Sequence, residues 1–192
     1  MKEECQMANA TKHLLADSLK DMLAIKTIDK ITIKEICENC NVNRQTFYYN
    51  FRDIYDLVEW ILDDDLETLV DNKTTYETWQ LGIRAVFDYA RENQYFVLNV
   101  FHSISLSVLR KYLKSRCKPI ILKMIEDRES GQNLSEESKD FVADFYSAQI
   151  ISIAYEWIES GMSNEYEEKL KKTEQLIAGS MDYVIEKVVN TI

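Results

Sequence analysis

The sequence is poor in the residues that break regular secondary structure. Its 192 residues include only four glycines and one proline. A fold made of many short strands needs both residues at its turns, so their scarcity argues against such a fold and favours long helices. Hydrophobic residues make up 46% of the chain, which is enough for a sizeable buried core. We therefore expect an all-α protein.

Groups suited to catalysis or membrane insertion are also few. The two histidines leave little general-base capacity, and no motif for a nucleophile, a metal or a phosphate is visible. No stretch approaches the roughly 18 apolar residues of a membrane span, and the N-terminus MKEECQMANA has no signal-peptide core. We expect a cytosolic protein that is not an enzyme, has reduced cysteines, and uses no cofactor, metal or membrane.

The net charge of −10 is spread unevenly along the chain. Residues 1–60 carry 8 basic and 10 acidic side chains, a net of −2, and the remainder carries 15 and 23, a net of −8. Residues 30–52 alone carry four basic and two acidic side chains, a net of +2. An anionic partner such as DNA would therefore meet this segment, with little long-range steering from the whole protein.

The pair Cys37-x-x-Cys40 has the spacing of half a zinc site. A structural zinc site usually has four ligands, and the remaining cysteines and histidines offer no second pair at a suitable spacing. The interpretation that we favour is that both cysteines fill a tight contact between helices.

Residues 32–51, TIKEICENCNVNRQTFYYNF, predict two short helices joined by a tight turn. Thr32 and Glu35 form the pattern of a capping box at the start of the first helix. Asn41 tolerates the left-handed conformation that a sharp bend between helices requires. Asn43 is placed to cap the second helix, in which Phe47 and Phe51 share one face as a core pair. This layout is typical of a helix-turn-helix, whose second helix enters the major groove of DNA.

These residues resemble the N-terminal signature of the TetR family of transcriptional regulators. The resemblance covers residues 10 to about 62 and rests on Thr32, Ile36, Cys37, Val42, Thr46, Phe47, Tyr48, Tyr49 and Phe51. The chain departs from the family pattern at three places. Asn41 stands where glycine is usual, Lys26 stands near another usual glycine, and Ile54 stands where a lysine usually contacts phosphate.

The resemblance implies a homodimer that binds palindromic double-stranded operator DNA. It also implies a tail over residues 1–9, a helix-turn-helix domain over 10–55, and a helical domain for effector binding and dimerisation over 56–192. The expected DNA-contacting residues surround the second helix of the motif: Thr32, Lys34, Asn43, Arg44, Gln45, Thr46, Tyr48, Tyr49 and Asn50.

The apolar periodicity predicts helices along most of the chain. The expected ranges are 11–26, 53–72, a helix after the capping box Thr74-x-x-Glu77, 94–103, 104–127, 135–160 and a last helix from Asn164. Pro119 should kink or divide the fifth of these, and residues 129–134 read as a loop.

Two helices near the C-terminus are predicted to form the dimer interface. The helix over 135–160 has one stripe through Phe141 and Phe145 and a second through Tyr146 and Ile153, so it is apolar over most of its circumference. We take the second stripe as the outer one. The apolar stripe of the last helix contains Leu170, Leu176, Ile177, Met181, Val184, Ile185 and Val188. Such a pair resembles the helices with which TetR-type proteins dimerise as a four-helix bundle.

The sequence also offers candidate residues for the site at which an effector would bind. Candidate residues for an effector pocket are Trp79, Phe87, Tyr89, Phe101, His102, Phe145 and Gln149. In the family an effector usually releases a repressor from DNA. The segment Trp157-Ile158-x-x-Gly161 also resembles regulators of dihydroxyacetone kinase operons. That resemblance implies the alternative that the effector is a partner protein and that the regulator activates transcription. A helical interaction module that reads no DNA is a further alternative, which the acidic charge favours.

Overall fold

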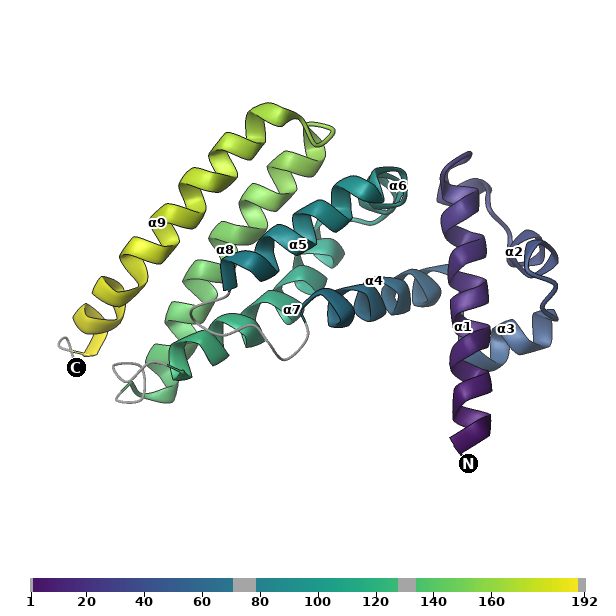
Figure 1. The fold of residues 1–192 in the computed structure, drawn as a ribbon, viewed down its shortest axis with the longest axis horizontal. Coiled ribbons are helices and arrows are strands. Elements are labelled where there is room, and N and C mark those ends of the chain that lie inside the picture. Colours follow the sequence, from purple (N-terminus) through teal and green to yellow (C-terminus); the bar gives the residue numbers. More distant parts are fainter. Residues whose placement is uncertain (1, 71–78, 128–133, 190–192) are drawn as a thin grey trace. The chain divides into compact units, whose positions relative to one another are not determined.

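The computed structural model describes residues 2–70, 79–127 and 134–189, and within these ranges it contains helices and no strand. It confirms the expected all-α fold class. The chain divides into two compact units, Met1–Leu69 with Asn93–Ser103, and Val70–Glu92 with Ile104–Ile192 (Figure 1). This division differs from the expected boundary at residue 55, because the N-terminal unit extends to Leu69 and also takes in a later helix.

The N-terminal unit consists of five helices and a short 3-10 turn. These are α1 (Lys2–Leu23), the turn Ile28–Lys30, α2 (Ile33–Asn39), α3 (Arg44–Asn50), α4 (Ile54–Val70, of which the last residue falls in the other unit) and α6 (Gln94–Ser103). The side chain of Asn99 in α6 donates a hydrogen bond to the carbonyl of Leu23 at 2.8 Å, which satisfies a free carbonyl at the end of α1. Lys20 in α1 pairs with Asp65 in α4 at 2.7 Å. These contacts tie α4 and α6 to the first helix.

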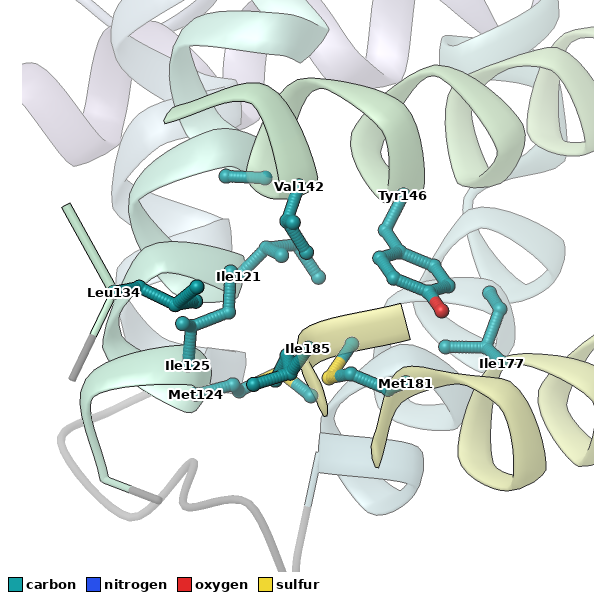
Figure 2. Close-up of a cluster of buried hydrophobic side chains, with 10 residues drawn as sticks. Ile121, Met124, Ile125, Leu134, Val142, Tyr146, Ile177, Met181 and Ile185 are labelled. Atoms are coloured by element: carbon teal, nitrogen blue, oxygen red, sulfur yellow. The ribbon is translucent and has the colours of Figure 1, made fainter. Parts of the chain in front are cut away.

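The C-terminal unit consists of α5 (Trp79–Glu92), α7 (Leu106–Glu126), α8 (Glu136–Glu159) and α9 (Asn164–Val189). Helix α8 packs against both α7 and α9. The side chains of this core converge between the three helices (Figure 2) and include Ile121, Met124, Ile125, Val142, Tyr146, Ile177, Met181 and Ile185. The Tyr146 hydroxyl reaches Ser180 at 3.0 Å, so its polar end is satisfied at the edge of the core.

Several helix boundaries differ from those that the sequence predicts. Helix α1 begins at Lys2, so the expected tail over residues 1–9 is helical except for its first residue, which lies outside the described ranges. Helix α7 continues through Pro119 and is not divided there. Burial of Ile121 and Ile125 on the α8 side of α7 provides the packing energy that offsets the missing backbone hydrogen bond. The capping box at 74–77 and most of the loop at 129–134 lie outside the described residues.

The outer face of α8 is the stripe through Phe141 and Phe145, not the stripe through Tyr146 and Ile153. Phe141 and Phe145 are 64% and 48% exposed, whereas Val142, Tyr146 and Trp157 on the other stripe are buried. The assignment of the Ile153 stripe as the outer one is therefore wrong. Leu176 was expected in the same apolar stripe of α9 as Ile177, but it is 70% exposed. It lies one residue before the buried Ile177 and thus on a different face.

Candidate nucleic-acid interface

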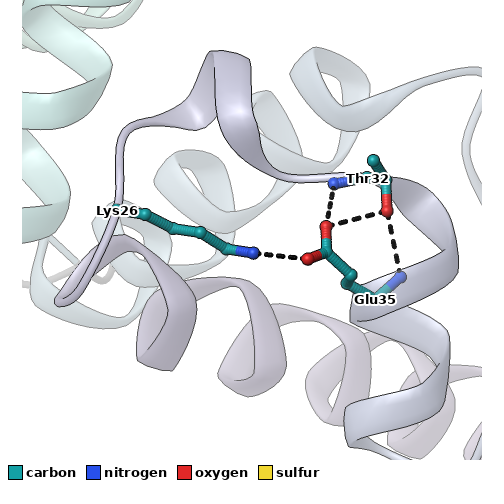
Figure 3. Close-up of polar contacts among 3 residues, drawn as sticks. All are labelled: Lys26, Thr32 and Glu35. Carbon is teal, nitrogen blue, oxygen red and sulfur yellow. Dashed lines mark hydrogen bonds and ion pairs between the residues drawn. The ribbon is translucent and has the colours of Figure 1, made fainter.

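The start of α2 is held by the capping box that the sequence predicts (Figure 3). The Thr32 hydroxyl oxygen accepts from the backbone N–H of Glu35 at 3.3 Å, and the Thr32 backbone N–H donates to the Glu35 carboxylate at 2.8 Å. Lys26 donates to the other carboxylate oxygen at 2.6 Å. The hydrogen bond from Lys26, followed by those from Thr32, lowers the pKa of Glu35 from 4.5 to about 2. Glu35 is therefore an anion at any ordinary pH, and it compensates the charge of Lys26.

The turn between α2 and α3 takes the shape that Asn41 permits. Asn41 has φ of 54°, and the backbone N–H of Val42 donates to the carbonyl of Cys37 at 2.9 Å. Cys37 is buried, and the Cys40 thiol donates to the carbonyl of Ile36 at 3.2 Å. Cys37 is thus buried as expected for a contact between helices, whereas Cys40 is half-buried and bonds to its own helix.

Helix α3 separates a buried aromatic face from an exposed face. The Asn43 side chain accepts from the backbone N–H of Gln45 at 2.9 Å, as expected for a cap. Phe47 is fully buried and lies 5.8 Å, between ring centroids, from Phe51. Tyr48 and Tyr49 are 59% and 86% exposed. The Tyr48 ring packs in a T-shaped arrangement on Phe47, with 5.7 Å between the ring centroids, so it is held in place. A surface of hydrogen-bonding side chains therefore backs onto a rigid core.

The remaining expected contact residues lie on or beside this surface. Arg44 and Gln45 are exposed in the first turn of α3, which contains no acidic residue. Thr46 and Asn50 are half-buried, and the Asn50 amide donates to the carbonyl of Thr46 at 2.8 Å. Lys34 on α2 is exposed and lies 3.6 Å from Glu38. The structure thus brings the nine residues together on α2, α3 and their caps.

The segment after α3 contains charged side chains that are not among the expected contact residues. Arg52 is exposed, and its guanidinium donates to Asp56 at 2.8 Å, as its backbone N–H does at 2.9 Å. These bonds lower the pKa of Asp56. Ile54 is half-buried. Lys12 on α1 lies over the rings of Phe51 and Trp60, at 5.9 and 5.6 Å from their centroids. The position of Lys12 beside α4 depends on a long-range contact, so no local pattern could reveal it.

The candidate effector-pocket residues are not gathered into one cluster. Phe101 and His102 belong to the N-terminal unit, whereas the others belong to the C-terminal unit. Phe145 and Gln149 are exposed on α8. Tyr89 is half-buried in α5, and Trp79 begins α5 with a side chain that lies outside the described part.

One contact in the C-terminal unit goes beyond what the sequence indicated. Phe87 in α5 packs on Trp157 in α8 with 4.7 Å between ring centroids, and the guanidinium of Arg91 lies 5.8 Å from the same ring. Trp157 is 2% exposed, and its indole N–H has no hydrogen-bond partner among the described residues. A buried donor that is left unpaired costs about 1–3 kcal/mol. Within the described residues, no helix is both long and apolar enough to cross a membrane.

Comparison with known proteins assigns the chain to a family. Residues 77–179, more than half of the sequence, match the TetR-type family described as "Transcriptional regulator C-terminal region". The chain is 27% identical over 157 residues to the "HTH-type dhaKLM operon transcriptional activator DhaS" of Lactococcus lactis subsp. lactis (strain IL1403), covering 81% of this chain and 83% of that protein.

A solved structure shows the same fold. The "Dihydroxyacetone kinase operon activator DhaS" superposes with a TM-score of 0.65 and 22% identity, over 95% of this chain and 97% of the other. At that identity the likeness concerns the fold alone. The match over residues 77–179 establishes the family, and the chain therefore belongs to the TetR family of transcriptional regulators and is not an enzyme.

Proposed function

We propose that this regulator binds palindromic double-stranded operator DNA as a homodimer through the surface of α2 and α3. The observation that carries the proposal is the two-sided nature of α3, in which buried Phe47 fixes the helix and its opposite side offers polar and aromatic groups. The proposed contacts are those of the expected set: Thr32, Lys34, Asn43, Arg44, Gln45, Thr46, Tyr48, Tyr49 and Asn50. We propose residues 10–55 as the DNA-reading module and 56–192 as the signal-receiving part.

Within this set the residues have different tasks. Thr32 and Asn43 cap helices, so they fix the positions from which α2 and α3 meet the DNA. Lys34 provides charge toward phosphate, because its pairing with Glu38 joins two exposed side chains and is weak. Arg44, Gln45, Tyr48 and Tyr49 project from α3 and reach the groove.

Dimerisation is proposed through the exposed faces of α8 and α9. Phe141 and Phe145 on α8 and Leu176 and Tyr183 on α9 are large apolar or aromatic side chains, each at least 48% exposed. Exposed apolar residues on neighbouring helices mark an interaction surface, and twofold symmetry requires the same surface on both copies. A dimer would present two α3 helices to half-sites about 34–36 Å apart, or a multiple of that distance.

The proposed signal is an effector that acts on the C-terminal unit. Phe87 and the unpaired N–H of Trp157 support a site between α5 and α8 for a small molecule that has a hydrogen-bond acceptor. If the regulator is a repressor, the effector shifts its conformational equilibrium toward a state in which the two α3 helices no longer fit both half-sites. Activation through a partner protein is the second candidate, favoured by the name of the curated relative, which is an activator.

A gel shift with the DNA upstream of the gene tests the central proposal. We expect a discrete complex with full-length protein that unlabelled specific DNA displaces and unrelated DNA does not. Binding that is equal for all DNA, or absent, would instead support the helical interaction module. A reporter fused to the bound promoter then separates the two signs of regulation, because deleting the gene raises expression under repression and lowers it under activation.

A further inference from the structure

The polar side chains around α3 differ in whether their donors and acceptors already form hydrogen bonds within the protein. Asn43 uses its amide oxygen to cap the helix, and Asn50 uses its amide nitrogen on the carbonyl of Thr46. The Thr32 hydroxyl is engaged with Glu35. Each of these three side chains would have to break a hydrogen bond within the protein before it could offer all of its donors and acceptors to DNA.

The cations of the motif show the same contrast. Lys26 is held by Glu35 at 2.6 Å, and Arg52 is held by Asp56 at 2.8 Å. Arg44 is exposed, has no acidic residue in its helical turn, and forms no ion pair among the described residues. Its guanidinium therefore has all five donors available.

On α3, Gln45 differs from Asn50, whose side-chain amide is already bonded within the protein. Its backbone N–H is taken by the Asn43 cap, which fixes the first turn of α3, while its side chain is exposed and has no hydrogen-bond partner among the described residues. Arg44 and Gln45 are consecutive, and their side chains leave the helix about 100° apart. The two side chains therefore face different positions in the groove.

The chemistry of each free group selects a base. Two parallel donors of a guanidinium match O6 and N7 of guanine, and the donor and acceptor of a primary amide match N7 and N6 of adenine. We propose that Arg44 reads a guanine and Gln45 reads an adenine in each operator half-site. This inference rests on the proposed DNA-binding function, and it adds the identity of the bases recognised.

Selection from random double-stranded DNA with the full-length protein tests the assignment. The wild type should enrich a twofold-symmetric motif that contains a strongly preferred guanine and adenine in each half. Arg44→Ala should lose the guanine and keep the rest of the motif, with affinity for the wild-type site lowered roughly 5- to 100-fold. Gln45→Glu should exchange the adenine for cytosine, because a carboxylate accepts from the cytosine amino group.

Two further variants separate base reading from attraction to phosphate. Arg44→Lys keeps the charge, so it should leave the salt dependence of binding unchanged while the guanine preference falls. Arg52→Ala removes a guanidinium that Asp56 already holds, so it should leave the motif unchanged. Circular dichroism should give the same helicity for all variants.

The outcomes separate this inference from the function on which it rests. If the wild type selects a motif and the Arg44 and Gln45 variants select the same one, the base assignment is wrong while the DNA-binding proposal stands. If Arg44→Ala weakens binding to all sequences equally, Arg44 contacts phosphate and the assignment is wrong. If Arg52→Ala also erases the guanine, the effect is not specific to Arg44. A wild type that selects no motif overturns both proposals.

Discussion

The helices of the DNA-reading motif and those of the C-terminal unit achieve stability in different ways. Helices α2 and α3 have 7 residues each, whereas α8 and α9 have 24 and 26. Isolated helices shorter than about 12–15 residues are marginal in water. The short helices therefore depend on caps and on a few fully buried anchors, while the long ones depend on apolar stripes that extend over several turns.

This difference has a consequence for how each part tolerates change. A single buried side chain, Phe47, anchors α3 in the N-terminal unit, whereas the α7–α9 core distributes burial over ten residues. Loss of one anchor should therefore disable the reading motif, while the long helices should lose function mainly through their exposed faces.

The largest effect is expected from Phe47→Ala. Removing a fully buried aromatic ring typically costs about 3–5 kcal/mol, which is a large part of the stability of a small unit. Operator binding should be lost, while light scattering should still detect the dimer proposed for the C-terminal unit. Ile25→Ala is the control, because Ile25 is exposed and should change stability by no more than about 0.5 kcal/mol. A Phe47→Ala protein that unfolds at the same urea concentration as the wild type would contradict the role of Phe47 as the single anchor of α3.

The second prediction concerns the exposed face of α8. Phe145→Glu places a charge in the proposed dimer interface, where burial without a partner is costly. Light scattering at micromolar concentration should show a monomer that retains its helicity. Leu81→Glu is the matched control, since Leu81 on α5 in the same unit is 65% exposed and should leave the dimer intact. A monomeric wild type, or a dimeric Phe145→Glu protein, contradicts the proposed interface.

The third prediction concerns the exposed side of α3. Tyr48→Ala should weaken operator binding by about 1–3 kcal/mol without changing the unfolding transition, because the ring is 59% exposed. Tyr48→Phe keeps the ring against Phe47 and removes only the hydroxyl, so it isolates the polar contact. Unaltered affinity of both variants in a gel shift would exclude Tyr48 from the interface.

The smallest effect concerns the capping box. The pKa of Glu35 is about 2 in the folded protein and 4.5 as the reference value, so its carboxylate stabilises the fold above pH 4.5. That contribution is lost as the pH falls from 4.5 through 2. Glu35→Gln should therefore be less stable than the wild type at pH 7, and the difference should shrink toward pH 2. Urea unfolding at several pH values measures it, and a difference that does not change with pH would contradict this role for Glu35.

The accuracy of the sequence predictions follows the range of the interactions concerned. The capping box of Thr32 and Glu35, the left-handed Asn41 and the cap at Asn43 all involve residues at most three positions apart, and all are present in the structure. The error at Leu176 arose because its helix is apolar on more than one side. The error in α8 has the same origin, since two of its faces carry apolar stripes.

Local sequence was enough to predict the all-α class, the two capped helices of the motif, the turn between them, and the outward position of Tyr48 and Tyr49. These features depend on local propensity and on the 3.6-residue period of the helix. The tertiary structure alone decided which stripe of α8 is buried, that α7 continues through Pro119, and that α6 joins the N-terminal unit through the bond from Asn99 to Leu23, 76 positions away. Such outcomes depend on which distant surfaces meet, and a local pattern carries no information about that.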